Sequence, residues 1–94
     1  MHPFKKNIYK TFLEKIFVYV TQIKVTVDST TTTNVVLNYT LKNGGETSQS
    51  LTYIPDAGIQ AKTIQINACV LEGSVFVSPE VISVEITYNN SMSC

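Results

Sequence analysis

Hydrophobic and polar residues alternate from Phe17 to Asp28, and this alternation predicts a β-strand. Successive side chains of a strand point to opposite faces. One face would carry Phe17, Tyr19, Thr21, Ile23, Val25 and Val27. The other face begins apolar at Val18 and Val20 and turns polar from Gln22 onward. We therefore expect a strand that runs from a covered region to a solvated edge.

A helical period precedes this strand. Its apolar residues recur every four positions, at Phe4, Ile8, Phe12 and Ile16. Pro3 suits the first turn of a helix, and lysines flank the apolar stripe. The pattern predicts an amphipathic helix from about residue 3 to 15. We expect this stripe to pack on the sheet or on another subunit; a membrane-surface anchor and a disordered basic arm that binds nucleic acid are the alternatives.

After residue 28 the chain alternates between apolar strand patterns and turn residues. The predicted strands are 34–42, 46–54, 59–71, 75–77 and 81–88. In three of these strands the apolar residues form rows. They are Val35, Leu37, Tyr39 and Leu41 on one side of their strand, Ile64, Ile66, Ala68 and Val70 facing inward, and Ile82, Val84, Ile86 and Tyr88 on one face. The segment 46–54 is diluted by polar residues, so we place it at an edge.

Turn chemistry separates these strands. Asn43-Gly44-Gly45 is a strong hairpin signal, because these residue types accept positive φ. Pro55-Asp56-Ala57-Gly58 is a turn by the same criterion. About six strands with turns at intervals of roughly ten residues predict a mainly β fold, an antiparallel β-sandwich (immunoglobulin-like) or a small barrel. We divide the chain into an N-terminal helix (1–16), a β domain (17–89) and a polar tail (90–94).

The run from Val35 to Gly45, followed by Tyr53–Gly58 and Lys62–Ile66, resembles immunoglobulin-like modules of bacterial and phage surface proteins. The resemblance covers roughly residues 17–89 and consists of the order and spacing of strands and turns. It implies adhesion, spacing or assembly rather than catalysis, and carries no functional residues. The chain departs from immunoglobulin and fibronectin type III domains in lacking a core Trp and a cysteine pair between the sheets.

Composition agrees with a small β domain. Apolar residues make up 44% of the 94 residues, enough for one core. Charged residues make up only 15%, below the ~25% of an average soluble domain, which is typical of β-rich extracellular or virion modules. The apolar run Ile16–Ile23 is shorter than the ~20 residues of a membrane span. We expect no signal peptide in this sequence, and the location of the protein is open.

Charge is unevenly distributed, although the formal net charge is zero. Residues 1–24 hold five lysines against one glutamate, which gives +4. Residues 25–94 hold two lysines against six acids, which gives −4. A basic segment attached to an acidic domain can pack against that domain, bind a second copy of the chain or bind an anionic partner. The sequence contains no Arg, the residue whose guanidinium most often makes paired hydrogen bonds to guanine and phosphate. We therefore expect no specific nucleic-acid partner.

Reactive residues are few. His2 is the one imidazole and lies beside the chain start, so we expect a solvated residue rather than a general base. One His and two distant thiols do not make a zinc site. The acids at predicted turns are Asp28, Glu46, Asp56, Glu72 and Glu80. We expect them to be solvated rather than to bind Ca²⁺. No catalytic, cofactor or metal site is predicted.

Cys69 is expected on the outer face of its strand, and Cys94 lies in the tail. We expect two free thiols; an intrachain disulfide, which needs the tail to fold back beside the strand, and an intermolecular bond are the alternatives. Asn38 and Asn89 begin glycosylation triplets, which matter only in a protein secreted by a eukaryote.

These patterns predict a non-enzymatic structural, assembly or binding module that acts through protein–protein contacts. The expected contact residues are Phe4, Ile8, Phe12 and Ile16, and the expected partner is a second copy or a larger assembly. The alternative is a peripheral membrane-binding or toxin-like protein that uses the basic helix. A small enzyme with a site in turn carboxylates is the least favoured.

Overall fold

The structure, a computed structural model, describes residues 16–94 and contains within them six strands and no α-helix. The strands are β1 (Phe17–Asp28), β2 (Asn34–Leu41), β3 (Gly45–Thr52), β4 (Ile59–Leu71), β5 (Phe76–Ser78) and β6 (Ser83–Tyr88). All strand pairs are antiparallel. The prediction of a mainly β chain with about six antiparallel strands is confirmed. The predicted helix lies outside the described residues, and so do the candidate contact residues Phe4, Ile8 and Phe12.

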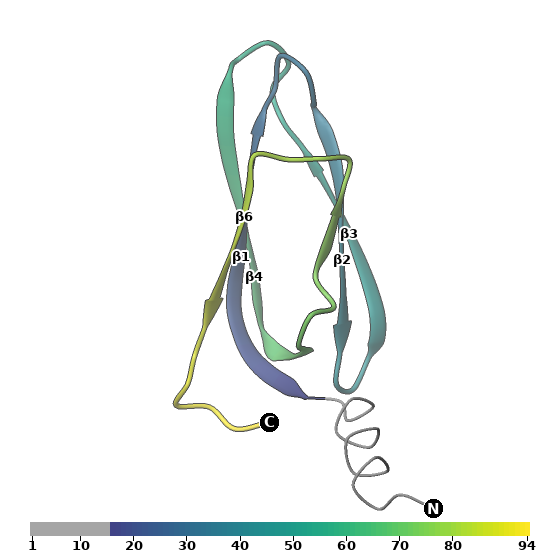
Figure 1. Cartoon of the computed structure of the whole chain (residues 1–94), viewed down its shortest axis with the longest axis vertical. Helices are drawn as coiled ribbons and strands as arrows, with labels where there is room; N and C mark the ends of the chain where they lie inside the picture. The colour runs from purple at the N-terminus through teal and green to yellow at the C-terminus, as the bar shows by residue number, and fades with distance from the viewer. Residues whose placement is uncertain (1–15) are drawn as a thin grey trace, which may run out of the picture.

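The strand order is β3-β2-β4-β1-β6, and β5 pairs with β2. β3 is therefore an edge strand, as predicted. The link between β2 and β4 is short: Leu41 pairs with Val70, and the Lys42 amide donates to the Cys69 carbonyl at 3.0 Å. Figure 1 shows the consequence, with β1, β4 and β6 on one side of the molecule and β2 and β3 on the other. The described residues thus form two three-stranded groups that meet at one end of β4.

The core lies between these two groups. Its buried apolar side chains are Val20, Ile23, Val25, Val27, Val35, Leu37, Tyr39, Leu51, Tyr53 and Val70. β1 supplies four of them and β2 three, although β1 and β2 are not hydrogen-bonded neighbours. The burial of alternate residues in β2 confirms that Val35, Leu37 and Tyr39 share one side of the strand, and shows that this side faces inward. Side-chain packing, rather than the strand ladder, therefore holds the two groups together over most of their length.

The predicted faces of β1 are wrong, because the alternation is interrupted at Thr21. Val20 pairs with Ala68 of β4 and Tyr88 of β6, whereas Gln22 pairs with Gln65 and Thr87. The register therefore shifts by one residue relative to each neighbour, which is a β-bulge. The bulge places Val20 on the same face as Ile23, whereas strict alternation would expose one of them. Both are buried, at 1% and 0% exposure.

Ser29 joins the end of β1 to the turn that precedes β4, and it is the buried polar residue of this part of the chain. Its amide and its hydroxyl both donate to the Gly58 carbonyl, at 2.8 and 3.0 Å. The hydroxyl also accepts from the Ala57 amide at 3.0 Å, and the Ser29 carbonyl accepts from the Asp56 amide at 3.1 Å. These bonds anchor the turn predicted at residues 55–58.

Tyr53 is the largest fully buried side chain. Its hydroxyl donates to the Val25 carbonyl at 2.8 Å, so it links the segment after β3 to the middle of β1. Burial raises the pKa of the Tyr53 phenol above its ordinary value of 10.0, because the phenolate would be poorly solvated there.

Replacing Ser29 with Ala should lower the free energy of unfolding by about 1 kcal/mol, because the Ala57 amide loses its acceptor and the Gly58 carbonyl loses one of its two donors in part-buried hydrogen bonds. Urea denaturation measures the change. Ser50→Ala, at an exposed position of β3, is the matched control and should leave the midpoint unchanged. Equal midpoints for the two variants would contradict the anchoring role of Ser29.

Tyr53→Phe should cost about 1–2 kcal/mol of unfolding free energy near pH 8 through the lost hydrogen bond. Above about pH 10 the wild type and the variant should become closer in unfolding free energy. The unfolded tyrosine there releases its proton before the folded one, so the wild-type chain loses stability as pH rises. Denaturation at both pH values tests this, with Tyr88→Phe as the exposed control. If the wild type and Tyr53→Phe differ in unfolding free energy by the same amount at both pH values, the raised pKa of Tyr53 is contradicted.

Candidate functional site

Charged and nucleophilic side chains do not converge in the described part of the chain. Among residues 16–94, no group of three or more His, Cys, Asp or Glu side chains could hold a metal ion. No helix within that range is long and apolar enough to cross a membrane. The predicted imidazole, His2, lies outside the described residues.

Asp28 illustrates how the acids at the turns are used. Its carboxylate accepts hydrogen bonds from the amide and the hydroxyl of Thr30, at 3.0 and 2.7 Å. These bonds favour the ionised form and hold the pKa of Asp28 below its ordinary value. The Asp28 carbonyl accepts from the amides of Thr31 and Thr32, both at 3.0 Å. Asp28 therefore shapes the polar turn after β1.

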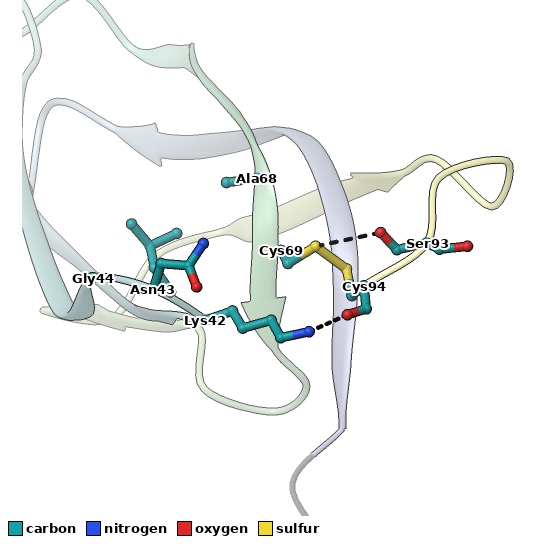
Figure 2. Close-up of a pocket in the computed structure, with 8 residues that line it drawn as sticks. Lys42, Asn43, Gly44, Ala68, Cys69, Ser93 and Cys94 are labelled. Atoms are coloured by element: carbon teal, nitrogen blue, oxygen red, sulfur yellow. Dashed lines mark hydrogen bonds between the residues drawn. A yellow bond between two sulfur atoms is a disulfide. The ribbon is translucent and has the colours of Figure 1, made fainter.

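A hollow of about 400 Å³ lies where the β2–β3 turn approaches Ser93 and Cys94 (Figure 2). It is lined by Leu41, Lys42, Asn43, Gly44, Ala68, Cys69, Ser93 and Cys94. Lys42 is the titratable residue of this lining, and its ammonium group donates to the backbone oxygen of Cys94. The hollow thus offers one lysine that already has a partner, beside a disulfide.

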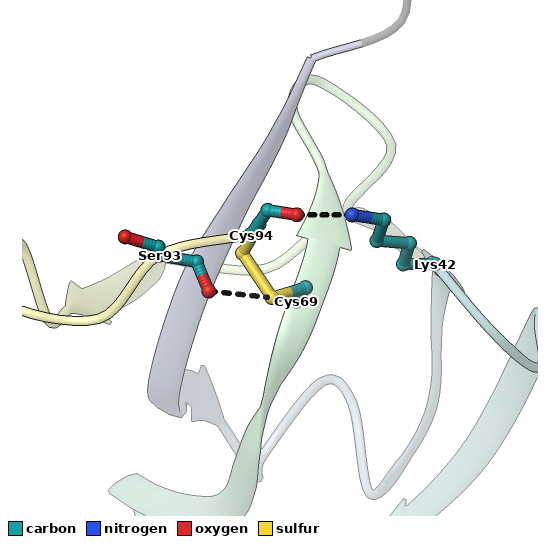
Figure 3. Close-up of a disulfide and its surroundings, with 4 residues drawn as sticks. All are labelled: Lys42, Cys69, Ser93 and Cys94. Carbon is teal, nitrogen blue, oxygen red and sulfur yellow. Dashed lines mark hydrogen bonds between the residues drawn. A yellow bond between two sulfur atoms is a disulfide. The ribbon is translucent and has the colours of Figure 1, made fainter.

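Cys69 and Cys94 form that disulfide, so the expectation of two free thiols is wrong (Figure 3). Their Cα atoms are 5.9 Å apart, within the usual span of a disulfide. Cys69 lies on β4 and the tail follows β6, with β1 between them. Cys69 is next to Val70, whose side chain faces the core, so the Cys69 side chain points to the outer face of the sheet. The tail therefore reaches Cys69 by crossing the outer face of β1. The alternative in which the tail folds back beside the strand is the one observed.

The tyrosines of β2, β6 and the segment after β3 are core or edge residues. Tyr39 and Tyr53 are buried in the core, at 5% and 1% exposure. Tyr88 is half exposed on β6. Both glycosylation triplets are engaged in local hydrogen bonds: the Asn38 side-chain oxygen accepts from the Ser48 hydroxyl, and that of Asn89 accepts from the Ser91 amide.

The candidate site that remains is an apolar surface on β6, which we call the β6 row: Val84, Ile86 and Tyr88. These residues pair with Val25, Ile23 and Val20, and paired residues of antiparallel strands point to the same face. The β6 row therefore lies on the core side of its sheet, which confirms its predicted common face. Nevertheless, Val84 is 37% and Tyr88 49% exposed.

An apolar hollow of about 150 Å³ adjoins the β6 row. It is lined by Val18, Val20, Val70, Leu71, Glu72, Gly73, Val75, Ile86 and Tyr88. Its walls come from the core faces of β1, β4 and β6 and from the turn after β4. Residues 16–94 by themselves therefore leave the core partly uncovered between β6 and this turn.

Sequence reasoning placed Val84, Ile86 and Tyr88 on one face but did not predict how exposed that face is. The residues of β6 contain no signal for this exposure, because it depends on strand order. Edge strands are commonly guarded by Lys or Pro, whereas β6 has neither and carries one charge, Glu85. The predicted contact residue Ile16 lies elsewhere: it is 52% exposed, and its carbonyl accepts from the Glu72 amide at 2.7 Å.

Reduction of the disulfide should lower the free energy of unfolding by about 3 kcal/mol, because it releases a loop closed over 25 residues. Urea denaturation with and without reductant measures the loss. The double variant Cys69→Ser/Cys94→Ser should show the lowered midpoint in both conditions. A wild-type midpoint that is insensitive to reductant would contradict the bond.

Comparison of the chain with models of protein families, with curated proteins and with solved structures finds no match. The candidate site is therefore defined by its own geometry: an apolar, core-facing row on an edge strand, next to a hollow that opens into the core.

Proposed function

We propose that this protein is a non-enzymatic assembly or binding module that acts through protein–protein contacts. The observation that carries the proposal is the amount of apolar surface left in solvent. Exposed large apolar residues are Ile16, Val36, Ile54, Ile59, Phe76, Ile82, Val84, Tyr88 and Met92. Single exposed apolar residues are normal, but adjoining ones mark interaction sites.

The fold supports a role in contact. We interpret the two three-stranded groups as the layers of an immunoglobulin-like β-sandwich, because β1 and β2 share one core without hydrogen-bonding to each other. Modules of this kind present edges and loops to partners. The disulfide supports an oxidising location such as a cell surface or a virion, since such bonds are rare in reducing compartments.

The N-terminal segment supplies a further proposed contact through Phe4, Ile8, Phe12 and Ile16. Among these residues the structure describes Ile16, which is half exposed and whose carbonyl accepts from the Glu72 amide in the turn after β4. The charge of +4 on residues 1–24, opposite a body of −4, also favours contact with a second copy. The same positive charge is the reason to keep a membrane surface as the second candidate.

The triple variant Phe4→Ser/Ile8→Ser/Phe12→Ser removes apolar side chains and keeps every lysine. We expect it to lower the assembled mass measured by light scattering after size-exclusion chromatography, as should deletion of residues 1–15. The comparison variant Lys5→Ser/Lys6→Ser/Lys10→Ser removes charge instead and should lower the assembled mass less than the triple apolar variant does.

Co-sedimentation with anionic vesicles separates the second candidate. Vesicle binding that the lysine variant loses, together with a monomeric wild-type chain at every concentration, would replace the proposed function with membrane attachment. An unchanged mass for both the triple variant and the deletion would remove the N-terminal segment as the contact.

A further inference from the structure

β6 is the edge strand of the described residues that is best suited to pairing with another strand. It pairs with β1 along one side, and within residues 16–94 no strand pairs with its other side. The opposite edge, β3, exposes polar residues at Glu46, Ser48, Ser50 and Thr52. β6 instead combines free backbone groups with the half-exposed β6 row, and unpaired backbone N–H and C=O groups of an edge are a template for strand addition.

The tail leaves this edge free. After Tyr88, the Asn89 amide donates to the Tyr19 carbonyl of β1 at 3.0 Å, and the chain then runs to Cys69 on β4. Its path is therefore over the outer face of β1, away from the unpaired side of β6. Figure 1 shows β6 and the tail along one side of the molecule, with the tail turning back toward the other strands.

We infer that β6 pairs with β6 of a second copy, antiparallel and about a two-fold axis. This inference rests on the proposed function and names its partner. A two-fold axis that joins antiparallel edges stands normal to the sheet, so the core faces of both copies lie on the same side. Directly opposed residues must then share a face, and the β6 row of one copy meets the β6 row of the other.

Charge excludes one register, and the pairing of apolar residues favours another. If Glu85 opposed itself across the axis, two carboxylates would meet, which is unfavourable. Moving the axis to Ile86 opposes Ile86 to itself, Val84 to Tyr88 and Glu85 to Thr87, so apolar residues meet apolar ones. The Glu85 carboxylate lies 4.0 Å from the Lys24 ammonium of β1, which draws its charge toward β1 and away from the unpaired edge. β6 is therefore self-complementary in this register.

The register makes a sharp test possible in the full chain. Glu85→Cys and Thr87→Cys both lie at exposed positions. Directly opposed residues have Cα atoms about 5 Å apart, so a mixture of the two single variants should form a disulfide-linked dimer under mild oxidation. Each variant alone should not, because the two equal positions are offset by two residues and lie about 8–9 Å apart, beyond disulfide reach.

A second variant tests the surface without an added cysteine. Val84→Lys puts a charge into the β6 row, an arrangement that blocks edge pairing, and should weaken dimerisation about tenfold or more in sedimentation equilibrium. Ile54→Lys makes the same kind of change at a site 68% exposed and away from β6, and should dimerise like the wild type. Circular dichroism verifies that both variants are folded.

The outcomes separate this inference from the proposed function. Cross-linking confined to the mixture, with weakening confined to Val84→Lys, supports pairing through β6. A chain that still assembles but shows neither effect overturns the pairing and leaves the proposed function in place. A wild-type chain that is monomeric at every concentration overturns the pairing as well and also removes self-assembly from the proposed function.

Discussion

The structure depends on the burial of β1 on its core face. This strand pairs with β4 on one side and β6 on the other, and supplies four of the buried apolar side chains. The bulge at Thr21 is what makes this burial complete, because it turns Val20 and Ile23 to the same side. Ser29 then ends the strand by tying it to the turn before β4. The remaining strands are arranged around this one apolar stripe.

The two groups of strands are held together unequally. At one end of β4 they share backbone hydrogen bonds, whereas elsewhere they rely on packing between β1 and β2 and on the Tyr53 hydroxyl. On the side of β6 the packing among the described residues is incomplete, and the core opens into a hollow. The disulfide ties the tail to the outer face of the same group. Within residues 16–94, β6 remains an edge strand with exposed apolar residues.

Polar side chains in the described residues serve the backbone. Asp28 orders the turn after β1, Ser29 anchors the turn before β4, and the Lys42 ammonium donates to the end of the tail. Ser29 and Lys42 are engaged where two segments meet, whereas Asp28 acts within its own turn. The proposed function rests on a different surface feature, the exposed apolar residues of β6.

The alternation of apolar residues by itself determined the six strands, the β2–β3 hairpin and the shared side of Val35, Leu37 and Tyr39 in β2, because period two and turn residues are local properties. Tertiary structure decided the rest. The bulge could not be predicted, since Val20 and Ile23 share a face only when both neighbouring strands shift register. The disulfide required a path of the tail across β1 that residue spacing does not contain. The β6 row is exposed because β6 lies at the edge of the sheet. Strand order sets that position, and the residues of β6 do not encode it.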